Sequence, residues 1–172
     1  FLPVLLAGGC VRVMGKFDCA KWLVHAQSDR TTITMLVPVQ YQRLMDFERF
    51  DDFDLTSLKL KYCTSAPFSA DLKREVLARM PGGLIEIYSM TEGGVVCLLA
   101  CHEFPDKLHT VGRPAPGSEL KVVDDEDREV PPGTPGNMIG RSLTMMSGYK
   151  NRPDKTAEAQ WIDPATGEVW MR

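Results

Sequence analysis

The stretch Leu84-Ile85-Glu86-Ile87-Tyr88-Ser89-Met90-Thr91-Glu92-Gly93-Gly94 decides the fold of this 172-residue chain. Its first part, 84–88, is a short apolar run of the kind that forms a buried strand. A polar loop follows it, and a second apolar run, 95–100, comes directly after the loop. The loop is therefore expected at the carboxyl end of a strand, which is where ligands bind in open α/β sheets.

The residue types in this loop suit a nucleotide triphosphate. The ring of Tyr88 can stack on a base. The hydroxyl of Thr91 can donate to a phosphate oxygen, and the carboxylate of Glu92 can hold Mg²⁺. Gly93 and Gly94 allow another group to approach the backbone closely. The residues alone leave two interpretations open, a nucleotide site and a turn that carries a surface glutamate.

Strand-like and helix-like segments alternate upstream of this stretch. The strands expected are 10–14, 33–37 and 58–62, and the helices expected are 18–27, 38–45 and 69–80. Asp18 and Ser69 are suitable N-caps, and Pro38 suits the first turn of a helix. This alternation predicts βαβ units, and hence an α/β fold with a partial, mostly parallel sheet layer over residues 1–106.

The character of the sequence changes after about residue 105. Proline and glycine now punctuate short strands, expected at 119–123 and 138–143, and a short helix is expected at 154–160. Such punctuation is typical of small β-sandwiches and barrels. A small β-barrel-like subdomain is therefore expected over residues 107–172.

Bulk properties exclude several classes of protein. A formal net charge of -3 gives no basic surface for nucleic acid. No apolar run approaches the roughly 20 residues of a membrane span. The five cysteines are odd in number and irregularly spaced, which favours reduced thiols in a cytoplasmic protein. Cys97 and Cys101, with His102 and His109 nearby, are interpreted as packing and loop residues rather than as a metal site.

The loop at 88–92 resembles the Tyr-Gly-x-Thr-Glu motif of the adenylate-forming superfamily. Thr64–Ser69 is similar to that family's Gly-Gly-Ala-Pro-Leu segment, and Thr110–Pro114 is similar to its Val-Gly-x-Pro entry to a small barrel. Pro135–Ile139 and Ser147–Asn151 resemble its Gly-Glu-Leu and Gly-Tyr-x-Asn segments. The order and spacing of these motifs also resemble the family's, and together they are far more specific than any one of them.

The resemblance implies an AMP-forming acyl-CoA synthetase that uses ATP and Mg²⁺, with CoA as co-substrate. Thr91 and Glu92 are the implied catalytic residues, Glu92 being the metal ligand. The implied nucleotide-binding residues are Ser65, Ala66, Pro67, Glu86, Ile87, Tyr88, Ser89 and Thr91, with Tyr88 stacked on adenine and the Glu86 side chain beside it. The implied pocket for the carboxylic acid consists of Ser89, Gly93, Gly94 and Val95.

Two further expectations concern what the sequence lacks. It contains no match to the family's Lys-containing phosphate loop or to its Thr-Gly-Asp motif, and it starts at Phe1 inside an apolar stretch. The chain is therefore expected to be a fragment that is inactive alone and that needs the remainder of its polypeptide. Its acid could be fatty, aryl or alicyclic, with fatty acid metabolism as one setting. Rival interpretations are a non-catalytic scaffold, a luciferase-like enzyme and a peptide-synthetase adenylation domain.

Overall fold

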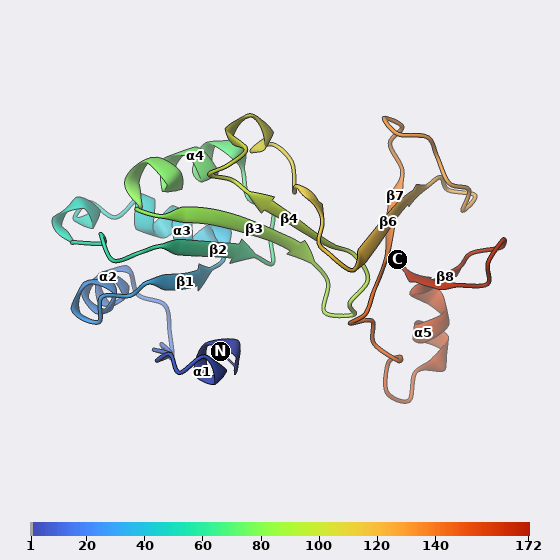
Figure 1. Ribbon diagram of the computed structural model, residues 1–172, viewed down its shortest axis with the longest axis horizontal. Helices are drawn as coiled ribbons and strands as arrows, with labels where there is room; N and C mark the ends of the chain where they lie inside the picture. The colour runs from blue at the N-terminus through green and yellow to red at the C-terminus, as the bar shows by residue number, and fades with distance from the viewer. Residues whose placement is uncertain (1) are drawn as a thin grey trace.

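The computed structural model describes residues 2–172 and contains two sheets that meet end to end (Figure 1). The first sheet has five strands in the order β1-β2-β3-β4-β5. The helices of this part are α1 (Leu2–Leu6), α2 (Cys19–Ser28), α3 (Pro38–Met45) and α4 (Ala70–Arg79). Its strands are β1 (Ile33–Leu36), β2 (Leu60–Thr64), β3 (Gly83–Ser89), β4 (Val96–Ala100) and β5 (Arg113–Pro114), and short 3₁₀ turns, Phe50–Asp52 and Pro105–Lys107, complete it.

The second sheet is antiparallel, with four strands in the order β6-β7-β9-β8. Its elements are β6 (Ser118–Val123), β7 (Asn137–Ser142), α5 (Pro153–Glu158), β8 (Gln160–Ile162) and β9 (Val169–Met171). In the part of the chain described, its outer strands β6 and β8 do not pair, so this sheet is open and the expected barrel is not closed. The first sheet extends through β5, which ends at Pro114.

The local signals for helices are confirmed. The side chain of Asp18 accepts a hydrogen bond from the Lys21 amide at the start of α2, and Ser69 does the same for Leu72 at the start of α4. Pro38 is the first residue of α3, where its missing amide costs nothing. Each of these helices begins where its cap or proline predicts.

The first sheet is more mixed than the sequence predicts. The β1–β2 and β2–β3 pairs are parallel, whereas the β3–β4 and β4–β5 pairs are antiparallel. For β3 and β4 the reason is their connection, which is a loop too short for the crossover that a parallel pair needs. The α/β class is confirmed, and the loop at 90–95 becomes the turn of an antiparallel hairpin.

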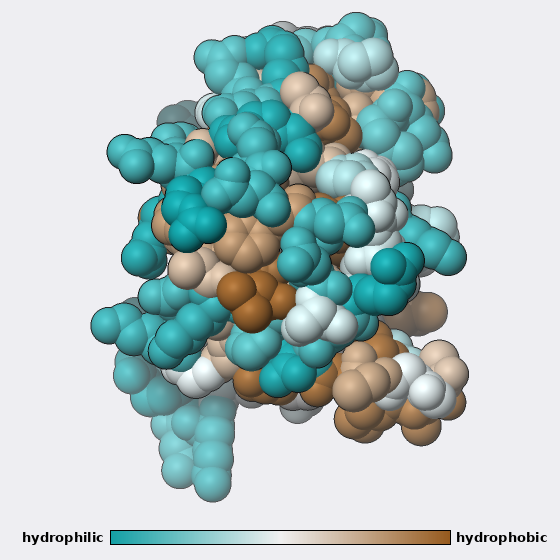
Figure 2. Space-filling model, turned by 90° about the vertical axis from the view of Figure 1, so that its left-hand side faces the viewer, coloured by the Kyte–Doolittle hydropathy of each residue, from teal (hydrophilic) through white to brown (hydrophobic). Residues whose placement is uncertain are grey.

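One predicted strand is wrong. Residues 10–14 follow α1 in irregular structure, and Arg12 forms an ion pair with Asp29 just beyond α2. Glycines at 8, 9 and 15 flank the segment and favour irregular backbone over a strand. Helix α1 buries none of its residues. Figure 2 shows an apolar lobe that projects from the surface at the same vertical level as α1 in Figure 1.

The main core lies between one face of the first sheet and helices α2, α3 and α4. Alternate strand residues such as Leu36, Cys63 and Leu84 are buried in it. The residues between them point to the other face by the strand pleat, and Ile33 and Met35 are 50% and 60% exposed there. A separate small core in the second sheet contains Val123, Ile139, Trp161 and Trp170. None of the helices in residues 2–172 is long and apolar enough to cross a membrane.

Candidate functional site

The predicted nucleotide-binding segments meet at one end of the first sheet. Thr64, the last residue of β2, lies opposite Ile87 of the parallel strand β3. The segment 65–67 therefore leaves the sheet beside Tyr88 and Ser89. Residues 65–67 and Ser89 are exposed, and Tyr88 is 40% exposed. The sheet thus presents two loops to solvent at the carboxyl ends of adjacent parallel strands.

The backbone of this edge has one unusual residue. Ser65 adopts a left-handed conformation with φ of 77°, which turns the chain sharply away from β2. The following residues 66 and 67 then run over the end of the sheet before Ser69 caps α4. This turn exposes the backbone of 65–67 beside Tyr88.

Glu92 lies in the β3–β4 loop, where this edge of the first sheet contacts the second part of the chain. The hydroxyl of Tyr149 donates a hydrogen bond of 2.7 Å to its Oε1 atom. This hydrogen bond lowers the pKa of Glu92 below its ordinary value, so its carboxylate is anionic at neutral pH. The same bond raises the pKa of Tyr149. Thr91, the neighbouring predicted residue, is exposed.

The two glycines serve a closer contact than the sequence suggests. Gly93 has a φ of +78°, and a Cβ at this position would lie 2.1 Å from the backbone oxygen of Thr144. The hydroxyl of Ser142 also donates to the Gly93 carbonyl. Gly94 is buried against Met171, and Val95 is buried against Gly140. The group that approaches residues 93–95 is thus the second sheet, and Ser89 is the predicted pocket residue that stays exposed.

The side chain of Glu86 differs from the expectation that it borders a base. It points to the helix-covered face and is buried, with its Oε2 atom 2.5 Å from Nζ of Lys73 in α4. Burial raises the pKa of Glu86, and the neighbouring Lys73 partly offsets that rise. Lys73 also donates to the carbonyls of Leu108 and Thr110, at 2.7 and 3.1 Å. The Glu86 carboxylate is therefore held inside the core by Lys73.

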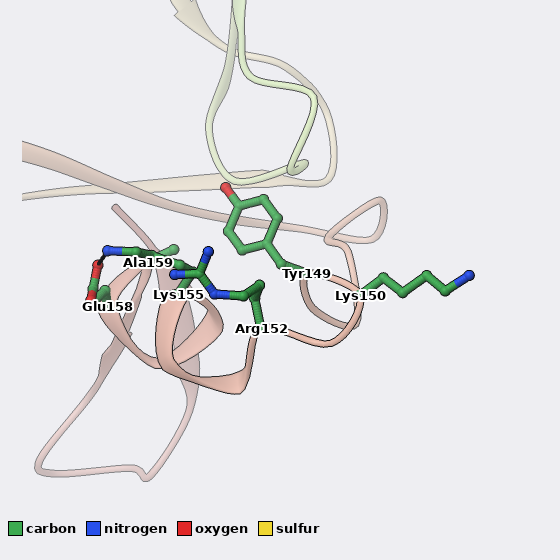
Figure 3. A pocket seen from close by; sticks show the side chains of 6 residues that line it. All are labelled: Tyr149, Lys150, Arg152, Lys155, Glu158 and Ala159. Atoms are coloured by element: carbon green, nitrogen blue, oxygen red, sulfur yellow. Dashed lines mark hydrogen bonds and ion pairs between the residues drawn. The ribbon is translucent and has the colours of Figure 1, made fainter.

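A depression in the surface lies elsewhere. A depression of about 620 Å³ is lined by Tyr149, Lys150, Arg152, Lys155, Glu158 and Ala159 (Figure 3). Arg152 is paired with Asp154 and Lys155 with Glu158, so these charges are already compensated. The Tyr149 ring points away from them, toward the β3–β4 loop. None of the predicted site residues lines this depression.

Two further side chains, Tyr41 and His102, make structural contacts. Tyr41 is fully buried, stacks on Phe68 and donates to the Tyr62 carbonyl at 2.9 Å. A ring nitrogen of His102 lies 3.2 Å from the Leu84 amide. Within residues 2–172, no three His, Cys, Asp or Glu side chains lie together as a protein-only metal site requires.

The comparisons with known proteins agree on one family. A family profile described as AMP-binding enzyme matches residues 1–150. Feruloyl-CoA synthase from an Amycolatopsis species is 34% identical over 161 residues, which are 91% of this chain and 32% of that protein. Indoleacetate–CoA ligase from Aromatoleum aromaticum is 33% identical over 154 residues, which are 87% of this chain and 29% of that protein.

The fold has a match among solved structures. An amide bond synthetase from Marinactinospora thermotolerans superposes with a TM-score of 0.85 at 28% identity, over 98% of this chain and 33% of that one. The chain thus spans about a third of the length of these relatives. Because the family profile covers most of the 172 residues, the chain belongs to the AMP-binding, adenylate-forming enzyme family.

Proposed function

We propose that the protein containing this chain is an AMP-forming acid–thiol ligase. It activates a carboxylic acid with ATP and transfers the acyl group to CoA. The observation that carries the proposal is the pairing of Thr64 with Ile87, because it brings both predicted nucleotide loops to one edge of the sheet. That edge is where open α/β sheets bind nucleotides.

Each residue at this edge of the sheet contacts a different part of the substrates in the proposed complex. The ring of Tyr88 stacks on adenine, and the backbone of 65–67 and of 86–87 borders the base. The hydroxyl of Thr91 donates to the α-phosphate. Ser89, exposed at the end of β3, borders the path of the acid. Its hydroxymethyl group narrows that path relative to a glycine.

Glu92 fits the role of a Mg²⁺ ligand. It is an anionic, half-buried carboxylate at the same edge, and Mg²⁺ in nucleotide sites is held by one or two carboxylates together with substrate phosphates. The absence of a three-residue cluster around it, in the residues described, agrees with that mode of binding. When bound, the ion would neutralise charge on the phosphate oxygens.

The proposed chemistry has two steps. An oxygen of the substrate carboxylate attacks the α-phosphorus of ATP, and the bond to pyrophosphate breaks. The sulfur of CoA then attacks the acyl carbon and releases AMP. Charge develops on the phosphate oxygens in the first step, where fixed donors such as the Thr91 hydroxyl are worth most.

We further propose that the acid is aromatic rather than a fatty acid. The names of the related proteins support this choice, since one is a feruloyl-CoA synthase and another an indoleacetate–CoA ligase. The likeness to an amide bond synthetase supports a second candidate acceptor, an amine in place of the CoA thiol.

The five cysteines are free thiols, which is consistent with a cytoplasmic protein.

The test uses the product of the complete reading frame that encodes this chain. The protein is incubated with ATP, Mg²⁺ and a panel of aryl, alicyclic and fatty acids, and pyrophosphate release is followed. Hydroxylamine traps the activated acyl group, and CoA or an amine is then supplied as acceptor. Acid-dependent pyrophosphate release supports the proposal, and the preferred acceptor decides between thiol and amine. If no acid leads to pyrophosphate release, the proposed activity is contradicted and the interpretation as a non-catalytic scaffold is supported.

The 172-residue chain alone is proposed to form no acyl-adenylate. It spans about a third of the length of its relatives and contains no match to the family's Lys-containing phosphate loop. Acid-dependent exchange of labelled pyrophosphate into ATP by the chain alone would contradict this proposal.

A further inference from the structure

Three hydrogen bonds join the β3–β4 loop to the segment 142–149 that follows β7. The Met146 amide donates to the Glu92 carbonyl at 2.8 Å, and the Ser142 hydroxyl donates to the Gly93 carbonyl. The third bond, from the Tyr149 hydroxyl to Glu92 Oε1, differs in kind, because it engages the side chain rather than the backbone. The carboxylate of Glu92 is thus fixed by a residue 57 positions away in the sequence.

The backbone of Tyr149 is held in place by helix α5. Its amide donates to Oγ1 of Thr156 in α5 at 2.9 Å, and the Thr156 amide bonds to the Arg152 carbonyl at 3.0 Å. Gly148 precedes it with a φ of 147°, and a Cβ there would lie 3.0 Å from Thr156 Oγ1. Helix α5 therefore sets the position of the Tyr149 backbone, and the ring extends from it to the loop (Figure 3).

The bond uses only one of the two carboxylate oxygens. Among the described residues no hydrogen bond reaches Oε2 of Glu92, so this oxygen remains available to another ligand. A carboxylate held through one oxygen keeps one rotamer and presents the other oxygen in a fixed direction. Residues that orient a metal ligand in this way commonly change metal affinity by about 10- to 100-fold when they are removed.

We infer that Tyr149 is a positioning residue that holds the Glu92 carboxylate ready for the magnesium–ATP complex. The inference rests on the proposed function of Glu92. In this role Tyr149 acts through Glu92. Because it is carried by the second part of the chain, that part completes the site at the edge of the first sheet.

The test compares Tyr149→Phe with Tyr41→Phe in the full-length protein. Both variants lose one tyrosine hydroxyl that makes a hydrogen bond of similar length, at 2.7 and 2.9 Å, but only Tyr149 contacts Glu92. In Tyr149→Phe, the Mg²⁺ concentration that half-saturates pyrophosphate release is expected to rise about tenfold, with the KM for the acid unchanged. Tyr41→Phe is expected to lower stability and to leave the Mg²⁺ dependence unchanged.

Two further measurements separate positioning from general destabilisation. Hydrogen–deuterium exchange without nucleotide is expected to accelerate at the Gly93 and Met146 amides in Tyr149→Phe but not in Tyr41→Phe. In a double-mutant cycle, Tyr149→Phe is expected to have little effect on turnover once Glu92→Gln is present, because the two residues act as one unit. Additive effects in this cycle would contradict the inference.

The outcomes also separate this inference from the proposed function. If the wild type is active and Tyr149→Phe shows wild-type Mg²⁺ dependence and wild-type exchange, the inference is overturned and the proposed function stands. If the wild type activates no acid, the proposed function falls. The exchange experiment then decides: accelerated exchange supports Tyr149 as the residue that holds the loop, and unchanged exchange overturns it.

Discussion

Glu92 belongs to the β3–β4 loop of the first sheet, and its carboxylate accepts a hydrogen bond from Tyr149 in the second part of the chain. Its position therefore depends on contacts that join the two parts of the chain. The role of the Glu92 charge can be tested by a substitution that removes the charge and keeps the shape of the side chain. Substitution by glutamine does this and preserves an acceptor for Tyr149.

In the full-length protein, Glu92→Gln is expected to lower the rate of acid-dependent pyrophosphate release by at least about tenfold, because a charge that faces the phosphates is lost. The measurement is initial velocity at saturating ATP and acid. Glu126→Gln serves as the control, because Glu126 lies in the exposed β6–β7 connection and pairs with Arg128. Equal rates for wild type and Glu92→Gln would remove Glu92 from the proposed mechanism.

Single residues were predictable only where a local rule placed them. The position of Tyr88 at a strand end follows from the strand pattern and from the edge rule for α/β sheets. The burial of Glu86 was not predictable, because its partner Lys73 belongs to a helix face that meets β3 only in the folded chain. The bond from Tyr149 to Glu92 likewise has no local signal in the sequence.

At the level of elements, the β3–β4 loop depends on its glycines for contact with the second sheet. Gly93→Ala is expected to destabilise the chain by about 2 kcal/mol or more beyond the conformational cost, because its Cβ would meet a backbone oxygen that cannot move aside. Gly117→Ala is the matched control. Gly117 has the same φ of +78° but nothing within 4 Å of the added Cβ, so it is expected to cost only about 1 kcal/mol.

Urea unfolding of both variants checks this expectation. The difference between their free energies of unfolding reports the steric cost of the added Cβ, since both glycines have the same φ of +78°. Equal losses would mean that the loop moves away from Thr144 without cost. In that case the close contact would not fix Glu92.

Lys61 joins β2 to the end of α4. Its amine is fully buried and donates to the carbonyls of Met80, Pro81 and Gly82, at 3.0, 2.7 and 2.7 Å. Burial lowers its pKa to about 8, so the amine is still mostly charged at pH 7 and all three donors are present. The long side chain of Lys61 thus caps the chain that leaves α4.

Lys61→Met is expected to destabilise the chain by about 2–3 kcal/mol at pH 7, because it leaves buried carbonyls without a donor. Lys59→Met is the control, since Lys59 is exposed and two residues away in sequence. Denaturant unfolding followed by far-ultraviolet circular dichroism measures both. Equal stability of the two variants would show that water replaces the amine at these carbonyls.

Elements were predictable where capping or proline signals were strong, as for α2, α3 and α4. The segment 10–14 was mispredicted because its strand-like pattern is flanked by glycines at 8, 9 and 15, which favour irregular backbone. Strands β8 and β9 gave no signal, since each has three residues and pairs only with other strands of the second sheet. The direction of β4 depended on the length of a loop rather than on any strand pattern.

At the scale of the whole molecule, the helices within residues 2–172 cover the first sheet on one face only. Parallel strands are usually buried on both faces. Here β1 is also an edge strand, and its outward residues Ile33 and Met35 are half exposed or more. An exposed apolar edge of this kind pairs readily with another chain.

The 172-residue chain alone is therefore expected to self-associate as its concentration rises, through the open face and edge of β1. Met35→Lys is expected to reduce that association without loss of secondary structure, because its side chain points away from the core and a lysine at a strand edge opposes pairing. Sedimentation velocity over a wide concentration range measures the association. Leu143→Lys is the control, since Leu143 is 97% exposed but lies after β7 in the second part of the chain. If Leu143→Lys disperses the chain and Met35→Lys does not, the associating surface belongs to the second part rather than to the uncovered sheet.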